Sequence, residues 1–352
     1  MTTISGDARP ISASTGDPRE EHFTIQGAHA GEQLFLRHLP SADSANRAQP
    51  GRVLFVHGAT FPSALAAAYR FDGESWMDNL SRAGLDVWAL DFVGYGESSR
   101  YPEMSDPADA HAPLGTAGQC ARQVAAALEF IRQHQHIARV SIVAHSWGTL
   151  ATGICATRHG DLIARLVLFG PIAMRHGQAS NVPAAAWWQV TEDYQWQRFQ
   201  TEVPDSEAPV FPHTTFDPWV ATYLATDPSH AERIPPSVRV PNGPVADIER
   251  AWAGTLPYDP AEITSPILLV RGEWDTVCNA ADFEWLKRRF ANAPVTAVTL
   301  PRGTHVMHLE QGRRRVYAAV TRFLGVRAPS GNGDDGGNGI SHGGIGETGV
   351  NI

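Results

Sequence analysis

A serine hydroxyl stands at the point where a strand pattern changes to a helix pattern. Residues 140–144 form a short apolar run that predicts a buried strand, and residues 149–159 are rich in small residues and predict a helix. Ser146 lies in the turn between them, with Ala144 and Gly148 two places on either side. Small residues are needed there because a sharp strand-to-helix turn brings the two backbones together. The pattern predicts a nucleophile elbow, with Ala where the first position of G-x-S-x-G has Gly.

The same turn would supply a donor for a developing negative charge. The backbone N–H of Trp147 lies at the predicted helix N-terminus and would point toward an oxyanion formed next to Ser146. A second donor is expected after the apolar run at residues 53–56, which leads into an H-G-A-T turn. We predict the N–H of Ala59 as this donor, with Thr60 as the alternative. A lone Ser before a helix is more simply an N-cap, so the interpretation depends on a base and an acid elsewhere.

Two later loops offer that base and that acid. A serine needs a general base to take its proton and a further group to orient the base. The strand expected at residues 266–270 leads into R-G-E-W-D, where Asp275 is the predicted acid and Glu273 the alternative. The last expected strand leads into P-R-G-T-H, where His305 is the predicted base. His308 is the alternative base, although its position favours the start or cap of the final helix.

Elements that must position these residues alternate between buried strands and helices. This alternation predicts an α/β fold with a mostly parallel twisted sheet and helices on both faces, preceded by an antiparallel hairpin over residues 22–26 and 33–39. In such sheets ligands bind at the carboxyl ends of the strands, and each candidate residue follows a strand. The remaining strands are expected at residues 53–56, 85–90, 140–144, 166–169, 266–270 and 295–300, and the helices at 73–83, 115–136, 149–159, 280–290 and 309–324.

The alternation stops between residues 172 and 255, which predicts a helical cap inserted into the main domain. Small-molecule pockets are lined mostly by apolar and aromatic side chains. We therefore predict that Trp187, Trp188 and Trp196 of this tryptophan-rich segment face a substrate cavity. Thr60 and His145 are expected at the same pocket. The expected cap helices span residues 184–201, 218–225 and 245–254.

Composition is typical of an ordinary soluble globular protein. The 352 residues are 43% hydrophobic and 18% charged, and the core is expected over residues 21–171 and 256–325 with the cap over 172–255. Residues 1–20 are expected to form a flexible arm. The Gly-rich residues 326–352 have no apolar periodicity and are expected to be a disordered tail.

Charge and cysteine content exclude several other classes. A net charge of −9 without a basic cluster argues against nucleic-acid binding, and the lack of an 18-residue apolar run argues against a membrane span. There is no signal-peptide pattern, and three cysteines without metal-like spacing predict free thiols and a cytoplasmic protein. We expect no metal and no cofactor, and a small-molecule substrate as the partner. The oligomeric state stays open between monomer and homodimer.

Taken together, the motifs resemble those of the α/β-hydrolase superfamily, in its esterase- and lipase-like serine hydrolases that carry a helical cap. The resemblance covers residues 22–325. It implies a catalytic triad of Ser146, Asp275 and His305 and an acyl-enzyme, but it does not specify the substrate. The leading hypothesis is hydrolysis of a carboxylic ester, lactone or thioester, and the tryptophan-rich composition of the cap favours a moderately bulky apolar acyl part. Ser at the elbow, where Asp would be needed, argues against epoxide hydrolase and haloalkane dehalogenase chemistry. The matching pieces are the H-G turn at His57 and Gly58, the D-x-x-G-x-G-x-S turn at 91–98, the elbow, R-G-E-W-D and G-T-H.

Three other functions share this scaffold. An acyltransferase or cyclase of secondary metabolism would use the same three residues with an alcohol or amine in place of water, and product analysis would separate it from a hydrolase. A ligand-binding receptor would bind tightly without turnover, and a phosphonate probe would not label Ser146. A non-hydrolytic lyase is the third alternative.

Overall fold

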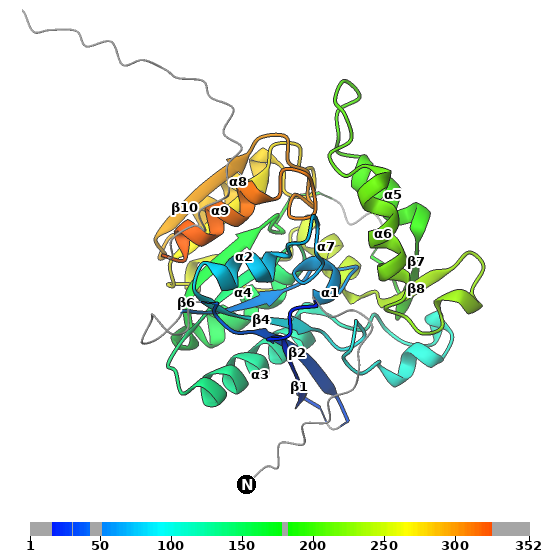
Figure 1. The fold of residues 1–352 in the computed structure, drawn as a ribbon, viewed down its shortest axis with the longest axis horizontal. Helices are drawn as coiled ribbons and strands as arrows, with labels where there is room; N and C mark the ends of the chain where they lie inside the picture. Colours follow the sequence, from blue (N-terminus) through cyan, green and yellow to red (C-terminus); the bar gives the residue numbers. More distant parts are fainter. Residues whose placement is uncertain (1–15, 30, 43–50, 178–181, 326–352) are drawn as a thin grey trace, which may run out of the picture.

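An eight-stranded, mostly parallel sheet forms the centre of the computed structural model, which describes residues 16–29, 31–42, 51–177 and 182–325 (Figure 1). The strand order is β1-β2-β4-β3-β5-β6-β9-β10. β1 and β2 form the predicted antiparallel hairpin at one edge, β2 also pairs antiparallel with β4, and every later pair is parallel. This confirms the predicted α/β-hydrolase fold. The strands are β1 (Glu21–Gln26), β2 (Gln33–Leu39), β3 (Gly51–Val56), β4 (Leu85–Asp91), β5 (Val140–His145), β6 (Ile163–Phe169), β9 (Ile267–Gly272) and β10 (Val295–Leu300).

Helices cover both faces of this sheet. α3 packs against α4, and α2 packs against α9. In Figure 1, α3 lies on one side of the sheet and α2 and α9 on the other. These helices are α1 (Ser63–Ala66), α2 (Trp76–Arg82), α3 (Ala117–Gln135), α4 (Gly148–Arg158), α8 (Ala280–Arg289) and α9 (Arg314–Phe323).

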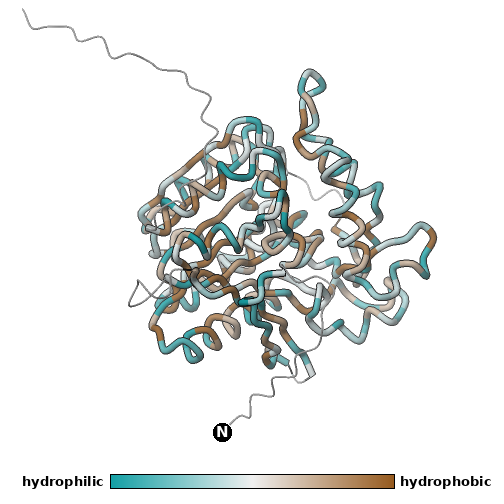
Figure 2. Tube along the Cα trace, viewed as in Figure 1, coloured by the Kyte–Doolittle hydropathy of each residue, from teal (hydrophilic) through white to brown (hydrophobic). Residues whose placement is uncertain are grey.

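Local sequence explains where these elements begin and why they are buried. β3, β4, β5, β6 and β9 each contain a run of three or four consecutive apolar residues, as strands covered on both faces require, and the tube along the chain is hydrophobic through the centre of the molecule (Figure 2). α2 begins at a capping box in which the Ser75 side chain accepts from the Asp78 N–H at 3.0 Å and Asp78 accepts from the Ser75 N–H at 2.8 Å. α3 and α8 begin with the same device.

The inserted segment (residues 172–255) is not purely helical, and the helix predicted over residues 184–201 is present only over residues 192–200. Residues 187–191 instead form the strand β7, which pairs antiparallel with β8. The tryptophans, valine and threonine of β7 suit a strand. The Thr191 side chain then accepts from the Tyr194 N–H at 3.1 Å and begins α5. The segment contains β7 (Trp187–Thr191), α5 (Glu192–Gln200), α6 (His213–Leu224), β8 (Ser237–Pro241) and α7 (Gly243–Trp252).

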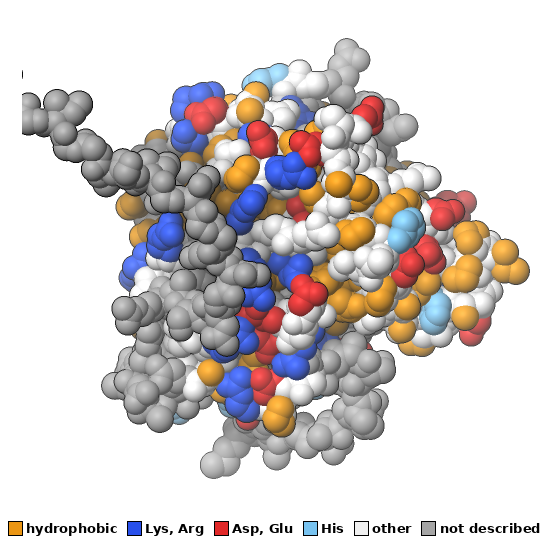
Figure 3. Space-filling view, turned by 45° about the horizontal axis from the view of Figure 1, so that its top comes forward, with side chains coloured by type: hydrophobic (Ala, Val, Ile, Leu, Met, Phe, Trp, Pro, Cys, Tyr) orange, Lys and Arg blue, Asp and Glu red, His pale blue; other side chains and the backbone are white. Residues whose placement is uncertain are grey.

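Large hydrophobic side chains that are exposed in the described residues all belong to this inserted segment; they are Val182, Tyr194 and Ile234. Figure 1 places α5, α6, β7 and β8 to one side of the sheet, and Figure 3 shows hydrophobic side chains gathered on that side of the molecule. The three cysteines are free and buried. None of the helices described here is long and apolar enough to cross a membrane.

The predicted arm lies outside the described residues up to residue 15, and the predicted tail, residues 326–352, lies outside them entirely. The last described residues of the arm contact the core, because Glu20 accepts from the buried Arg37 guanidinium at 2.8 Å.

Candidate active site

Ser146 occupies a sharp turn between β5 and α4. Its φ of 53° is left-handed, which is rare for a residue with a side chain, and its N–H donates to the Phe169 carbonyl at 3.0 Å. The turn brings α4 so close to the loop after β3 that a Cβ at Gly148 would lie 2.3 Å from the His57 carbonyl oxygen. The strained backbone therefore holds the hydroxyl at the carboxyl end of the sheet. Glycine at position 148 allows α4 to lie close to the loop after β3.

Side chains from three loops meet at this hydroxyl. The Ser146 Oγ lies 2.7 Å from His305 Nε2, and His305 Nδ1 lies 3.1 Å from both carboxylate oxygens of Asp275. Ser146 follows β5, Asp275 follows β9 and His305 follows β10, so all three stand at carboxyl ends of parallel strands. If the hydroxyl donates to Nε2, the imidazole proton resides on Nδ1 and is donated to Asp275. The arrangement can move a proton from the serine to the imidazole.

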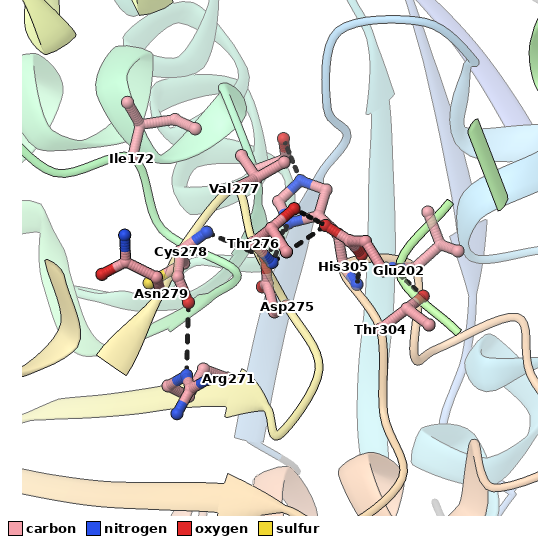
Figure 4. Close-up of polar contacts among 12 residues, drawn as sticks. Ile172, Glu202, Arg271, Asp275, Thr276, Val277, Cys278, Asn279, Thr304 and His305 are labelled. Carbon is pink, nitrogen blue, oxygen red and sulfur yellow. Dashed lines mark hydrogen bonds and ion pairs between the residues drawn. The ribbon is translucent and has the colours of Figure 1, made fainter. Parts of the chain in front are cut away.

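Asp275 is fixed by its own loop. Its Oδ1 accepts from the Cys278 N–H at 2.8 Å, and Figure 4 shows Asp275 between Cys278 and His305. The alternative acid, Glu273, instead accepts from the Arg302 N–H at 3.0 Å. The geometry thus brings Asp275, and not Glu273, to the imidazole.

The alternative base, His308, lies away from the serine. Both ring nitrogens are buried without a hydrogen-bond partner among the described residues, and the ring packs against Phe61, Trp76 and His145. Burial and the nearby His305 lower the pKa of His308 to about 3, so the ring is neutral. The prediction that it starts the final helix was wrong, because turns continue to Arg313 and α9 begins at Arg314.

A glycine that the sequence did not single out makes room for the imidazole. Gly170 follows β6 with a φ of 53°, and a Cβ there would lie 2.9 Å from two atoms of the His305 ring. The Gly-Pro pair at 170–171 signalled the end of a strand, but a turn signal does not reveal which side chain the glycine will face.

Hydrogen bonds set the direction of the predicted oxyanion donor at Ala59. His57 Nε2 accepts from the Phe92 N–H at 3.2 Å, so its Nδ1 carries the proton and donates to the Gly58 carbonyl at 2.8 Å. The Ala59 N–H belongs to the same trans peptide as that carbonyl and points the opposite way. On its other side, the Ala59 carbonyl accepts from the Tyr95 hydroxyl at 2.6 Å. Both peptides that flank Ala59 are therefore fixed.

The second predicted donor, Trp147, is tied to the inserted segment. Its indole N–H donates to Asp247 of α7 at 3.1 Å, and the same carboxylate oxygen accepts from the Ala117 N–H at 2.6 Å. Burial raises the pKa of Asp247 although these hydrogen bonds and Arg250 oppose the shift. Neither Ala59 nor Trp147 appears as a backbone donor in the hydrogen bonds of the described residues, which leaves both N–H groups available.

Among the predicted pocket residues, His145 lies under the site. It is buried and stacks on Phe169 at 4.4 Å, and its Nε2 donates to the His305 carbonyl at 3.0 Å. Burial and the neighbouring His308 and His305 lower its pKa well below the usual value. His145 therefore holds the backbone of the candidate base, while the half-buried Thr60 follows the Ala59 donor.

Each of the three tryptophans has a partner, which belongs to the core for Trp187 and to the inserted segment for Trp188 and Trp196. The Trp187 indole donates to the Asp106 carbonyl at 3.1 Å. Trp188 packs edge-on against Tyr194 at 4.9 Å, and Trp196 stacks on His213 at 3.6 Å. None lines either of two surface cavities of about 300 and 370 Å³ in the described residues. Their role in a substrate pocket stays a prediction.

The site is closed, and a carboxylate from the inserted segment lies beside it. Ser146, Asp275 and His305 are only 6%, 2% and 4% exposed. Glu202, just after α5, accepts hydrogen bonds from the backbone N–H of His305 and from Thr276 (Figure 4). No sequence motif marks this residue, because its contacts exist only once the inserted segment has folded against the core. The described residues contain no group of three or more His, Cys, Asp or Glu side chains that could hold a metal ion.

Comparisons with known proteins agree with this architecture. Residues 48–312 match the family described as Serine aminopeptidase, S33, whereas no curated protein matches the sequence. A serine hydrolase involved in carbazole degradation (CarC enzyme) is similar in structure, with a TM-score of 0.58 and 16% identity over 87% of this chain and 99% of that one. At such identities the likeness concerns the fold.

Two further solved structures have similar folds. An epoxide hydrolase from Vigna radiata has a TM-score of 0.57 and 14% identity over 87% of this chain and 98% of that one. Est1E from Butyrivibrio proteoclasticus, solved with ferulic acid, has a TM-score of 0.51 and 17% identity over 86% of this chain and 97% of that one. These neighbours include an epoxide hydrolase and a serine hydrolase, so they share a scaffold and do not identify a substrate.

Proposed function

Since the chain belongs to the Serine aminopeptidase, S33 family and is an α/β-hydrolase enzyme, we propose that it is a serine hydrolase acting through an acyl-enzyme on Ser146. The observation that carries this proposal is the 2.7 Å contact between Ser146 Oγ and His305 Nε2, with Asp275 on the other ring nitrogen. A nucleophile, a base and an orienting acid within hydrogen-bonding range are what acyl transfer needs.

The reaction follows from these positions. His305 Nε2 takes the Ser146 proton as Oγ attacks the substrate carbonyl, and the N–H groups of Ala59 and Trp147 stabilise the oxyanion, each by about 3 kcal/mol. His305 then gives the proton to the leaving group, and the acyl-enzyme forms. Water, deprotonated by His305, attacks the acyl carbon, and the acid product leaves as Oγ recovers its proton.

The substrate proposed is a carboxylic ester, lactone or thioester with a moderately bulky apolar acyl part. Support for an apolar part comes from the contact between the core and the inserted segment. Phe61, two residues after Ala59, packs against Trp219 at 5.3 Å and against Phe199 at 6.2 Å. A substrate group that binds next to these aromatic side chains is expected to be apolar and not charged.

Turnover of p-nitrophenyl esters with acyl chains of increasing length tests this function. Ser146→Ala is expected to abolish turnover and labelling by a fluorophosphonate while the thermal unfolding midpoint stays the same. Full turnover by Ser146→Ala would overturn the covalent mechanism. Matched p-nitroanilides distinguish an esterase from an amidase, and an added alcohol that diverts the product would instead indicate acyl transfer.

A further inference from the structure

Glu202 connects the inserted segment to both loops that carry the candidate acid and base. Its Oε2 accepts from the His305 backbone N–H at 2.6 Å, and its Oε1 accepts from the Thr276 N–H at 2.9 Å and the Thr276 hydroxyl at 2.6 Å. Figure 4 shows Glu202 joined to both residues, with Thr276 directly after Asp275. One carboxylate therefore bridges the loop after β9 and the loop after β10.

This bridge acts on the part of His305 that sets the position of its ring. Glu202 holds the His305 N–H, and His145 donates to the His305 carbonyl at 3.0 Å, so the backbone of the base is held on both sides. On the far end of the bridge, Thr276 fixes the backbone next to Asp275. A shift of either loop would change the 3.1 Å separation between His305 Nδ1 and the carboxylate.

The environment of Glu202 keeps the carboxylate ionised and dry. Its side chain is 1% exposed, and Arg198 Nη1 lies 3.7 Å from Oε1. Burial raises the pKa of Glu202, but the charges of His305 and Arg198 and the hydrogen bonds from Thr276 and His305 together hold it below the usual value. The hydrogen-bond partners of its two oxygens, from Thr276 and His305, are donors, so an amide at this position would turn an N–H₂ group toward at least one donor.

We propose that Glu202 is a positioning residue, by which the inserted segment keeps Asp275 and His305 aligned for proton transfer from Ser146. This inference rests on the proposed serine hydrolase function. Glu202 touches neither the serine nor the imidazole nitrogens in the contacts described, so it acts through the two backbones. Outer hydrogen-bond partners of metal-binding residues contribute about 10- to 100-fold to activity, and we expect an effect of the same order from Glu202.

A purely structural role would fasten the inserted segment without affecting catalysis, and the chain offers a matched control for that role. Glu207 lies five residues further along the same segment and pairs with Arg302, which belongs to the loop that carries His305. This pair is largely exposed and contacts neither Asp275 nor His305. Glu207→Gln therefore removes a link between the same two parts of the chain without touching the proposed alignment.

The test compares full-length Glu202→Gln and Glu207→Gln with the wild type. We expect Glu202→Gln to lower kcat on a p-nitrophenyl ester by about 10- to 100-fold with KM changed less than about threefold, because the substrate does not contact Glu202. Its fluorophosphonate labelling rate should fall by a similar factor, and Glu207→Gln should stay within about twofold of wild type in both. A folded Glu202→Gln with wild-type kcat and labelling, or an equal loss in Glu207→Gln, would overturn the proposal.

Two additional measurements keep the test decisive. If Glu202→Gln does not fold, Thr276→Val removes one donor to Oε1 and is expected to lower kcat about threefold or more; unchanged kcat would count against the bridge. The proton NMR resonance of His305 Nδ1–H reports the contact with Asp275 without any turnover. Loss of this resonance in Glu202→Gln but not in Glu207→Gln supports the positioning role. If wild-type Ser146 proves unreactive, the proposed function fails, but this result would still support the positioning role. If the resonance persists in Glu202→Gln, the positioning role is wrong.

Discussion

The Trp147 indole is anchored to Asp247 by a 3.1 Å hydrogen bond that links the residue after Ser146 to helix α7. The same carboxylate oxygen accepts from the Ala117 N–H at the start of α3. One side chain of the inserted segment thus fastens two parts of the core, one of which carries a proposed oxyanion donor.

Replacing Asp247 with Ala should therefore destabilise the protein and lower its rate of turnover. Two buried donors lose their acceptor, so we expect the free energy of unfolding to fall by about 3 kcal/mol, with a smaller loss in Asp247→Asn because the amide oxygen still accepts. Urea unfolding measures both. Asp217→Ala, at an exposed pair with His213 in the same segment, should change stability by less than about 0.5 kcal/mol. Equal losses in Asp247→Asn and Asp247→Ala would contradict the role of this acceptor.

Gly170→Ala should impair activity more than stability. The added Cβ would meet the His305 ring at 2.9 Å, and the ring must move away from Ser146 or Asp275. A displacement of about 1 Å costs on the order of 100-fold in rate, and the left-handed backbone adds about 1–2 kcal/mol of strain. Measurements of kcat and of the thermal unfolding midpoint separate the loss of rate from the loss of stability. Gly160→Ala is the control, since a Cβ there meets nothing within 4 Å; a fully active Gly170→Ala would show that the ring has room.

Much of the core could be predicted because its signals are local. β3, β4, β5 and β6 each contain a run of three or four consecutive apolar residues, and Ser146, Asp275 and His305 are polar residues in the loops that follow predicted strands. Parallel strands bring their carboxyl ends together, so sequence position alone predicted that the three side chains would meet. The hairpin of β1 and β2 was equally visible from its alternation.

Other features depend on contacts between distant segments and left no local signal. β7 and β8 are five residues each and pair only with one another, and the tryptophans of β7 fit a helix pattern as well as a strand pattern. Glu202 and Asp247 are single acids in a segment without a motif. Their partners, among them Thr276 and Trp147, lie about 70 to 100 residues away in the chain.

Tyr95→Phe tests whether the loop at Ala59 must be held. The hydroxyl donates to the Ala59 carbonyl at 2.6 Å, and the ring packs edge-on against His57 at 4.9 Å, a contact that Phe retains. We expect kcat to fall about tenfold with little change in KM, because an oxyanion donor acts mainly in the transition state. Tyr101→Phe, which removes a weak 3.4 Å contact with Gln123, is the control. Should Tyr95→Phe raise KM alone, the loop would serve substrate binding instead.

Glu310 should make stability depend on pH in the neutral range. Burial, reinforced by the nearby carboxylates of Glu202 and Asp275, raises its pKa from 4.5 to about 7, although the N–H and hydroxyl of Thr304 donate to it. A carboxyl whose pKa is higher in the folded state stabilises that state fully below pH 4.5 and loses this effect as pH rises through 7. The change amounts to about 3 kcal/mol at most.

Urea unfolding between pH 5 and pH 8 measures this effect against Glu310→Gln, whose neutral side chain keeps an oxygen for Thr304. The free energy of unfolding of Glu310→Gln should increase relative to that of the wild type as pH rises, because only the wild type must bury a negative charge at high pH. Glu284→Gln, at an exposed pair with Lys287, should show no such trend. A constant difference between Glu310→Gln and the wild type across this range would mean that Glu310 is already ionised at pH 5, and that its two bonds from Thr304 outweigh the cost of burying the charge.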